Sequence, residues 1–85
     1  MKYLYVGQST VLRGEDVIGV FDLDNASAGK WTRVLLSQAE KRGSLENAAA
    51  DLPRSFVLTK NGGVYLSQLN TATLKSRWDS EDWRF

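Results

Sequence analysis

The 85-residue sequence contains no cysteine and no histidine, and it has only one proline. The absence of cysteine excludes disulfide bonds and thiol catalysis. The absence of histidine excludes the usual zinc and iron sites and every histidine-based catalytic triad. We therefore expect no metal, no cofactor, no catalytic residues and no small-molecule substrate.

Long apolar runs are also missing. No stretch approaches the roughly 20 residues needed to cross a membrane. The apolar patch within the N-terminal MKYLYVGQ is too short for a secretion signal. We expect a cytoplasmic protein without membrane contact.

The short length limits the size of the core. A domain of this size hides only about 60–65% of the surface of its unfolded chain. Stability must come from packing, and self-association as a homo-oligomer would add to it. We assign residues 1–77 to a single domain and residues 78–85 to an acidic and aromatic C-terminal tail.

Charge is unevenly distributed although the net charge is only +1. Residues 1–26 carry two basic and four acidic side chains, and residues 78–85 carry one basic and three acidic. Residues 27–77 carry eight basic against three acidic side chains, a net charge of +5. A basic middle between acidic ends is typical of a polyanion-binding surface, and an uneven solvated surface remains the alternative.

The residue patterns predict an α+β fold, with a small twisted antiparallel sheet and one main helix packed on it. Strands are expected at 2–6, 9–12 and 17–21. The clearest signal is Asn61-Gly62 between two β-rich runs, which predicts a hairpin over 55–69 with a type I′ turn. Asn70 then caps a short C-terminal helix over 71–78, in which Leu69 and Leu74 have the spacing of a hydrophobic staple.

The main helix is expected over residues 27–42. Ser27 is the candidate N-cap, and Gly43 follows a basic last turn as a stop signal. At about 100° per residue, Trp31 and Leu35 fall on one apolar stripe with alanines above and below. We expect these two side chains to pack the helix on the sheet, which leaves a mostly basic face outward.

Two enzyme classes have sequences similar to the segment before this helix. Gly29-Lys30 resembles the end of a phosphate-binding P-loop, but Asp24 and Trp31 stand where that loop needs glycine and a hydroxyl residue. Asp22 and Asp24 have the spacing of the nucleophile and acid of haloacid-dehalogenase phosphatases. Such an enzyme needs further carboxylates across a larger α/β sheet. We expect a turn here, in which side-chain oxygens accept backbone N–H groups, and no enzyme activity.

Several stretches in order resemble a known family: VIGVFDLDN, AEKRG, DLPRSFVLT and VYLSQLNTATLKSR. Together they resemble the small bacterial extracellular-matrix regulators of the RemA/RemB type, closest to the RemB branch, over about residues 3–77. The resemblance implies a cytoplasmic DNA-binding transcription regulator of biofilm-matrix genes, with a small twisted antiparallel sheet and a packed helix. It also implies a closed ring of subunits that presents a repeated DNA-binding surface, as in the RemA branch.

The candidate contact residues follow from charge and from this resemblance. For double-stranded DNA they are Lys30, Arg33, Lys41, Arg42 and Arg54, acting mainly on phosphates. For the oligomer interface they are Trp78, Trp83 and Phe85. Asp16, Asp51 and Leu52 stand where the RemA branch carries arginines attributed to DNA contact. A protein-interaction or assembly module that modulates a related ring-former without binding DNA therefore remains the alternative.

Overall fold

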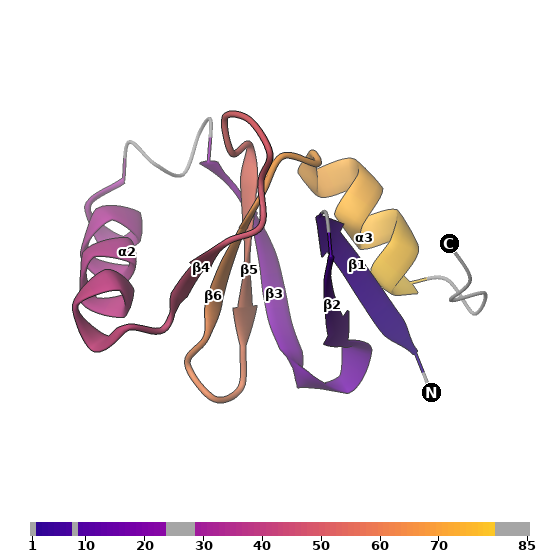
Figure 1. Ribbon diagram of the computed structural model, residues 1–85, viewed down its shortest axis with the longest axis horizontal. Helices are drawn as coiled ribbons and strands as arrows, with labels where there is room; N and C mark the ends of the chain where they lie inside the picture. Colours follow the sequence, from indigo (N-terminus) through magenta and orange to yellow (C-terminus); the bar gives the residue numbers. More distant parts are fainter. Residues whose placement is uncertain (1, 8, 24–28, 80–85) are drawn as a thin grey trace.

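The computed structural model describes residues 2–7, 9–23 and 29–79. It confirms the expected α+β fold (Figure 1). The elements are β1 (Tyr3–Gly7), β2 (Thr10–Arg13), the 3-10 helix η1 (Gly14–Asp16), β3 (Val17–Asp22), α2 (Lys30–Arg42), β4 (Leu45–Asn47), β5 (Ser55–Thr59), β6 (Val64–Ser67) and α3 (Thr71–Asp79).

Within the described residues, four strands form a mixed sheet in the order β3-β5-β6-β4, and β1 and β2 form a separate antiparallel pair. β5 runs antiparallel to both of its neighbours, whereas β4 runs parallel to β6. The sequence patterns missed β4 and its parallel pairing. Its three residues, Leu-Glu-Asn, include no β-branched or aromatic side chain, so they carry little strand signal.

The four-stranded sheet is packed on both faces. In Figure 1, α2 lies on one side of the sheet, and the β1–β2 pair and α3 lie on the other. Adjacent residues of β5 show the division, because Phe56 and Val57 are both fully buried but belong to different clusters. The cluster of Ala39, Phe56 and Val64 lies on the face toward α2, and we call this face the α2 side. The opposite face, which we call the α3 side, holds the cluster of Leu4, Val6, Val17, Ala48, Val57 and Leu74.

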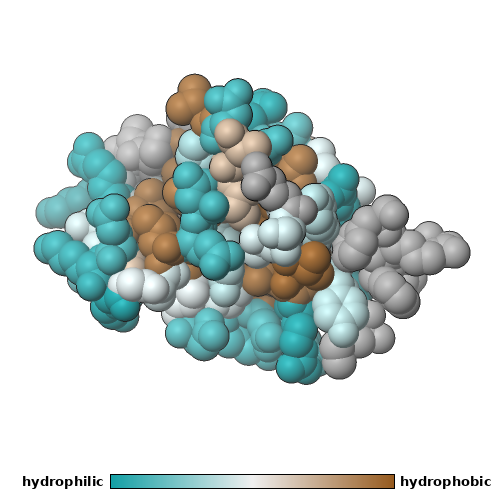
Figure 2. All heavy atoms as spheres, viewed as in Figure 1, coloured by the Kyte–Doolittle hydropathy of each residue, from teal (hydrophilic) through white to brown (hydrophobic). Residues whose placement is uncertain are grey.

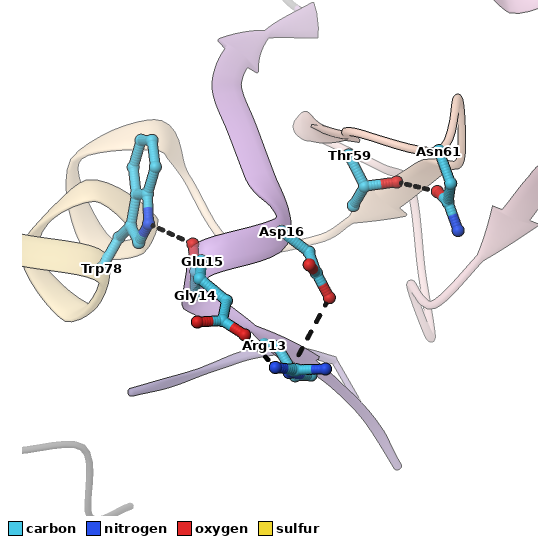
Figure 3. Close-up of polar contacts among 7 residues, drawn as sticks. All are labelled: Arg13, Gly14, Glu15, Asp16, Thr59, Asn61 and Trp78. Carbon is cyan, nitrogen blue, oxygen red and sulfur yellow. Dashed lines mark hydrogen bonds and ion pairs between the residues drawn. The ribbon is translucent and has the colours of Figure 1, made fainter. Parts of the chain in front are cut away.

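Polar contacts and a close backbone approach fix the elements of the α3 side. The buried Ser67 hydroxyl donates to the Val6 carbonyl at 2.5 Å, which ties β6 to β1. The Trp78 indole N–H donates to the Gly14 carbonyl at 3.1 Å, which ties α3 to η1 (Figure 3). Gly7 lies so close to the end of β4 that a Cβ built on it would be 2.2 Å from the Ala48 carbonyl oxygen.

Two expectations about α2 are wrong. The helix begins at Lys30, three residues later than expected. Its N-cap is Gly29, which has no side chain to bond to the first turn. Ser27 itself lies outside the described residues. Trp31 is 57% exposed, and the fully buried helix positions are Thr32 and Ala39. At about 100° per residue, Trp31 lies roughly a quarter turn from the line through Thr32 and Ala39, so only one edge of the expected stripe is covered.

Other local expectations are confirmed. Gly43 ends α2 in the left-handed conformation with φ 75°, and its N–H bonds back to the last turn. Asn70 caps α3, because its side-chain oxygen accepts the Thr73 N–H at 2.8 Å. Leu69 packs against the cluster that contains Leu74, as a hydrophobic staple requires.

The hairpin over β5 and β6 is confirmed, but its turn is not type I′. A type I′ turn needs positive φ at both central residues, and among the described non-glycine residues none has a positive φ. Gly62 alone takes one here, at 86°. Four residues, 60–63, connect the two strands, and the Thr59 N–H donates to the Gly63 carbonyl at 3.0 Å. The Asn61 side chain accepts the Thr59 hydroxyl at 2.7 Å (Figure 3) and the Gly63 N–H at 3.2 Å.

Candidate nucleic-acid interface

Helix α2 carries four of the five candidate DNA-binding residues, and all four are exposed: Lys30, Arg33, Lys41 and Arg42. The helix contains one acidic residue, Glu40, so its four cations and one anion give a net charge of +3 over 13 residues. Figure 2 shows hydrophilic side chains along the outer edge of the molecule over α2 and apolar ones between α2 and the sheet.

Helical geometry places three of these cations on one outward face. At about 100° per residue, Lys30, Arg33 and Lys41 fall within about a quarter turn of one another, and Arg42 lies further round the helix. Lys30 and Lys41 are eleven residues apart, or about 16 Å along the axis at 1.5 Å per residue. The three cations are therefore spread along most of the length of α2.

The cations of α2 make no ion pair within the part of the chain that the structure describes. Among the described residues, the ion pairs join Arg13 to Glu15 and, at 4.0 Å, to Asp16 (Figure 3), and none involves a side chain of α2. Arg13 is therefore neutralised at the β2–η1 corner. Asp16 contributes a second carboxylate to the same corner. The structure thus places a neutralised corner on one side of the sheet and a free cationic helix on the other.

Arg54 lies at the N-terminal end of α2 and not at its C-terminal end. Its backbone N–H donates to the Ser67 carbonyl at 2.8 Å, and its carbonyl accepts the Leu23 N–H at 3.0 Å. Leu23 is where the chain leaves β3 on its way to α2. Figure 1 accordingly shows the β4–β5 loop at the end of the sheet from which the chain passes to α2, while α2 ends toward the opposite end. The Arg54 side chain is exposed.

The β4–β5 loop presents an apolar residue that the sequence patterns did not single out. Leu52 is 80% exposed, the largest fraction among the described large apolar side chains. Hydrogen bonds hold the loop, because the Ala50 N–H donates to the Gln68 side chain at 2.6 Å and the Leu52 N–H donates to the Asp51 carboxylate at 2.8 Å. Between β4 and Arg54 this loop contains no lysine or arginine.

Trp31 is a second exposed residue that the patterns misplaced. Its ring meets the Phe21 ring edge-on, with centroids 5.6 Å apart and an interplanar angle of 61°. The indole is therefore anchored at one edge and open on much of its surface. The polar Thr32 is buried instead, and no signal in the sequence marked it for that position.

The structure describes one of the three candidate residues for the oligomer interface. Trp78 is half-buried, packs against the α3 side and bonds to Gly14 within its own chain. Trp83 and Phe85 lie outside the described residues. The structure therefore gives Trp78 an intramolecular role in holding α3.

The segment considered for enzyme activity is described only in part. Asp22 is the last residue of β3, and Asp24 and Asn25 lie outside the described residues. No group of three or more Cys, Asp or Glu side chains among the described residues is arranged to hold a metal ion.

No helix in the described part of the chain is long and apolar enough to span a bilayer.

Fold and surface together define a small α+β domain with a free cationic helix on one side of a doubly packed sheet. The model of the RemA-like family, described as extracellular matrix regulatory protein A-like, matches residues 3–78. The chain belongs to this family, whose description is that of extracellular matrix regulatory proteins. A comparison with curated proteins gave no match.

Proposed function

We propose that this protein is a DNA-binding transcription regulator of extracellular-matrix (biofilm) genes and that it belongs to the RemB branch. It acts in the cytoplasm, without enzyme activity. Family membership supports the role in matrix regulation. The observation that carries DNA binding is the free +3 charge of α2.

The contact is made mainly to phosphates. Lys30, Arg33 and Lys41 form one cationic face, and each phosphate they neutralise releases condensed counterions. Contacts of this kind fix position on the duplex without reading bases. Arg54 adds a further cation beside the N-terminal end of α2, where backbone bonds to β3 and β6 hold its position.

The protein acts as a homo-oligomer, and we propose a closed ring. A single domain offers few phosphate contacts, so repeated weak sites on several subunits would supply avidity. β3 and β4 are the outer strands of the described four-stranded sheet, and subunit contacts would protect such edges. Light scattering at micromolar concentration and moderate salt tests this, because a monomer mass would contradict it.

Fluorescence anisotropy with two unrelated duplexes at several salt concentrations tests DNA binding. Arg33→Ala and Arg54→Ala should weaken binding about equally on both sequences, because phosphate contacts carry no sequence information. The slope of log affinity against log salt should fall by about 0.9 for each phosphate that the variant no longer neutralises. Lys75→Ala is the matched control, because Lys75 is exposed on α3 and away from α2. Unchanged affinity and slope in both arginine variants would exclude this surface.

One observation favours a second function. Leu52 is exposed on the hydrogen-bonded β4–β5 loop. A protein-interaction module that modulates a related ring-forming regulator would use such a residue as an anchor. If the wild type binds no duplex, co-sedimentation with a ring-forming family member should show a complex that Leu52→Ser removes.

A further inference from the structure

Three aromatic rings form a continuous series from the core to the surface on the α2 side. Phe56 is fully buried, and the half-buried Phe21 stacks on it with centroids 5.1 Å apart and an interplanar angle of 23°. Trp31 then meets Phe21 edge-on at 5.6 Å and is 57% exposed. The outermost ring is thus held by two others while more than half of its surface stays open.

A cation adjoins this open indole at the start of α2. Lys30 precedes Trp31 and is exposed and free of ion pairs among the described residues. Arg33 lies about 160° round the helix from Trp31 and belongs to the face of Lys30 and Lys41. A partner of this surface must therefore be anionic and must offer an apolar face to the indole. A single-stranded nucleic acid has both properties, because its bases expose their π-faces between phosphates.

Two other partners fit this surface less well. A second copy placed by two-fold symmetry on this helix would bring two charges of +3 together. An anionic lipid surface needs a broad apolar stripe to enter the interface. The exposed large apolar side chains described on α2 are Trp31 and Val34, and its other large apolar residues, Leu35 and Leu36, pack toward the sheet.

We infer that Trp31 stacks on an unpaired nucleobase while the adjacent Lys30 neutralises a flanking phosphate. The inference rests on the proposed DNA-binding function and adds a preference for single-stranded segments. In an intact duplex each base is stacked on its neighbours, so its π-faces are closed to the indole. Base–aromatic stacking tolerates any sequence, because every base has a π-face.

A pair of oligonucleotides isolates the stacking contribution. A 20-nucleotide deoxythymidine strand and an abasic strand of equal length carry the same phosphates, and only the first carries bases. Wild-type protein should bind the deoxythymidine strand roughly 5- to 100-fold more tightly, the range expected for one stacked base. Trp31→Ala should remove this preference, Trp31→Phe should retain part of it, and both should leave duplex binding unchanged. Val34→Ala is the matched control and should retain the preference in full.

An NMR readout on the wild-type protein keeps the test independent of variant stability. The chain has three tryptophans, and Trp31→Phe identifies the indole N–H signal of Trp31. This signal should shift on addition of the deoxythymidine strand and remain in place with the abasic strand.

The outcomes are distinct. Equal binding of the two strands, or a preference that survives Trp31→Ala, overturns the stacking role even where duplex binding stands. Absence of binding to duplex and single strand alike overturns both this inference and the proposed function. Trp31-dependent binding to vesicles of equal phosphatidylcholine and phosphatidylglycerol, or Trp31-dependent self-association, without a preference for bases also overturns it.

Discussion

The two sides of the central sheet differ in how completely they are buried. On the α3 side, six residues from three strands, a loop and a helix are buried together, and serine and tryptophan side chains bond to backbone carbonyls across elements. On the α2 side, three residues are buried, and most of the surrounding apolar side chains are only half-buried. The same strand, β5, supplies both clusters.

This difference separates stability from surface function. The α3 side holds the fold through complete burial and through paired polar groups. Helix α2 buries Thr32 and Ala39 and packs the half-buried Leu35 and Leu36 against the cluster, so its outer face is free to carry cations and an open indole. A helix with few packing constraints tolerates the uneven charge that a nucleic-acid surface requires.

Removing a large side chain from the α3 side should cause the largest loss of stability. Leu74 is fully buried, so Leu74→Ala should lower the free energy of unfolding by about 2–5 kcal/mol. Leu36→Ala on the half-buried α2 side should cost less. Urea unfolding followed by circular dichroism measures both. A larger loss for Leu36→Ala would show that α2 holds the fold.

The close approach of β1 to the end of β4 should be the next most sensitive point. A Cβ at Gly7 would lie 2.2 Å from the Ala48 carbonyl oxygen, so Gly7→Ala must displace backbone and should cost about 1–3 kcal/mol. Ala48→Gly should not rescue this variant, because the clash is with the carbonyl and not with the methyl group. Thermal unfolding of the single and double variants tests this, and full rescue would contradict it.

The hairpin and α3 could be predicted from the sequence because local residues determine them. Asn61-Gly62 marks a reversal, and Asn70 with Leu69 and Leu74 marks the start of a helix. The type of turn could not be predicted, because the Asn61 side chain bonds to Thr59 and Gly63 across the loop. The turn preference of Asn-Gly does not show these side-chain bonds.

The candidate site was predictable in composition but not in arrangement. The cations of α2 belong to one short segment, so their shared face follows from helical geometry. The place of Arg54 beside the start of α2 depends on the pairing of β3 with β5 and on the bond from Leu23 to Arg54. The exposure of Trp31 depends on which side of α2 meets the sheet, and Thr32 decides this from a buried position that its polarity does not suggest.

The N-caps of α2 and α3 allow the same comparison of the two sides, with smaller expected changes in stability. Asn70 accepts the Thr73 N–H on the α3 side, so Asn70→Ala should cost about 1 kcal/mol. Gly29 caps α2 without a side-chain bond and has extended backbone angles. Gly29→Ser should therefore be neutral or stabilise by a few tenths of a kcal/mol, since serine and glycine caps differ by about that amount. Thermal unfolding measures both, and equal losses would contradict the difference between the helices.

The smallest effect on stability should come from the cationic face itself. Lys30, Arg33 and Lys41 make no ion pair among the described residues, so replacing all three with Ala removes no salt bridge and relieves repulsion within α2. The triple variant should unfold within about 0.5 kcal/mol of the wild type, as surface changes usually do. Its DNA affinity should nevertheless fall, with a salt slope lower by about 2.7 if each cation contacts one phosphate. A loss of stability that equals that of Leu74→Ala would show that these side chains support the fold. Unchanged stability with an unchanged salt slope would instead show that the α2 side is a solvated surface, and the exposed Leu52 loop would then be the better candidate for partner contact.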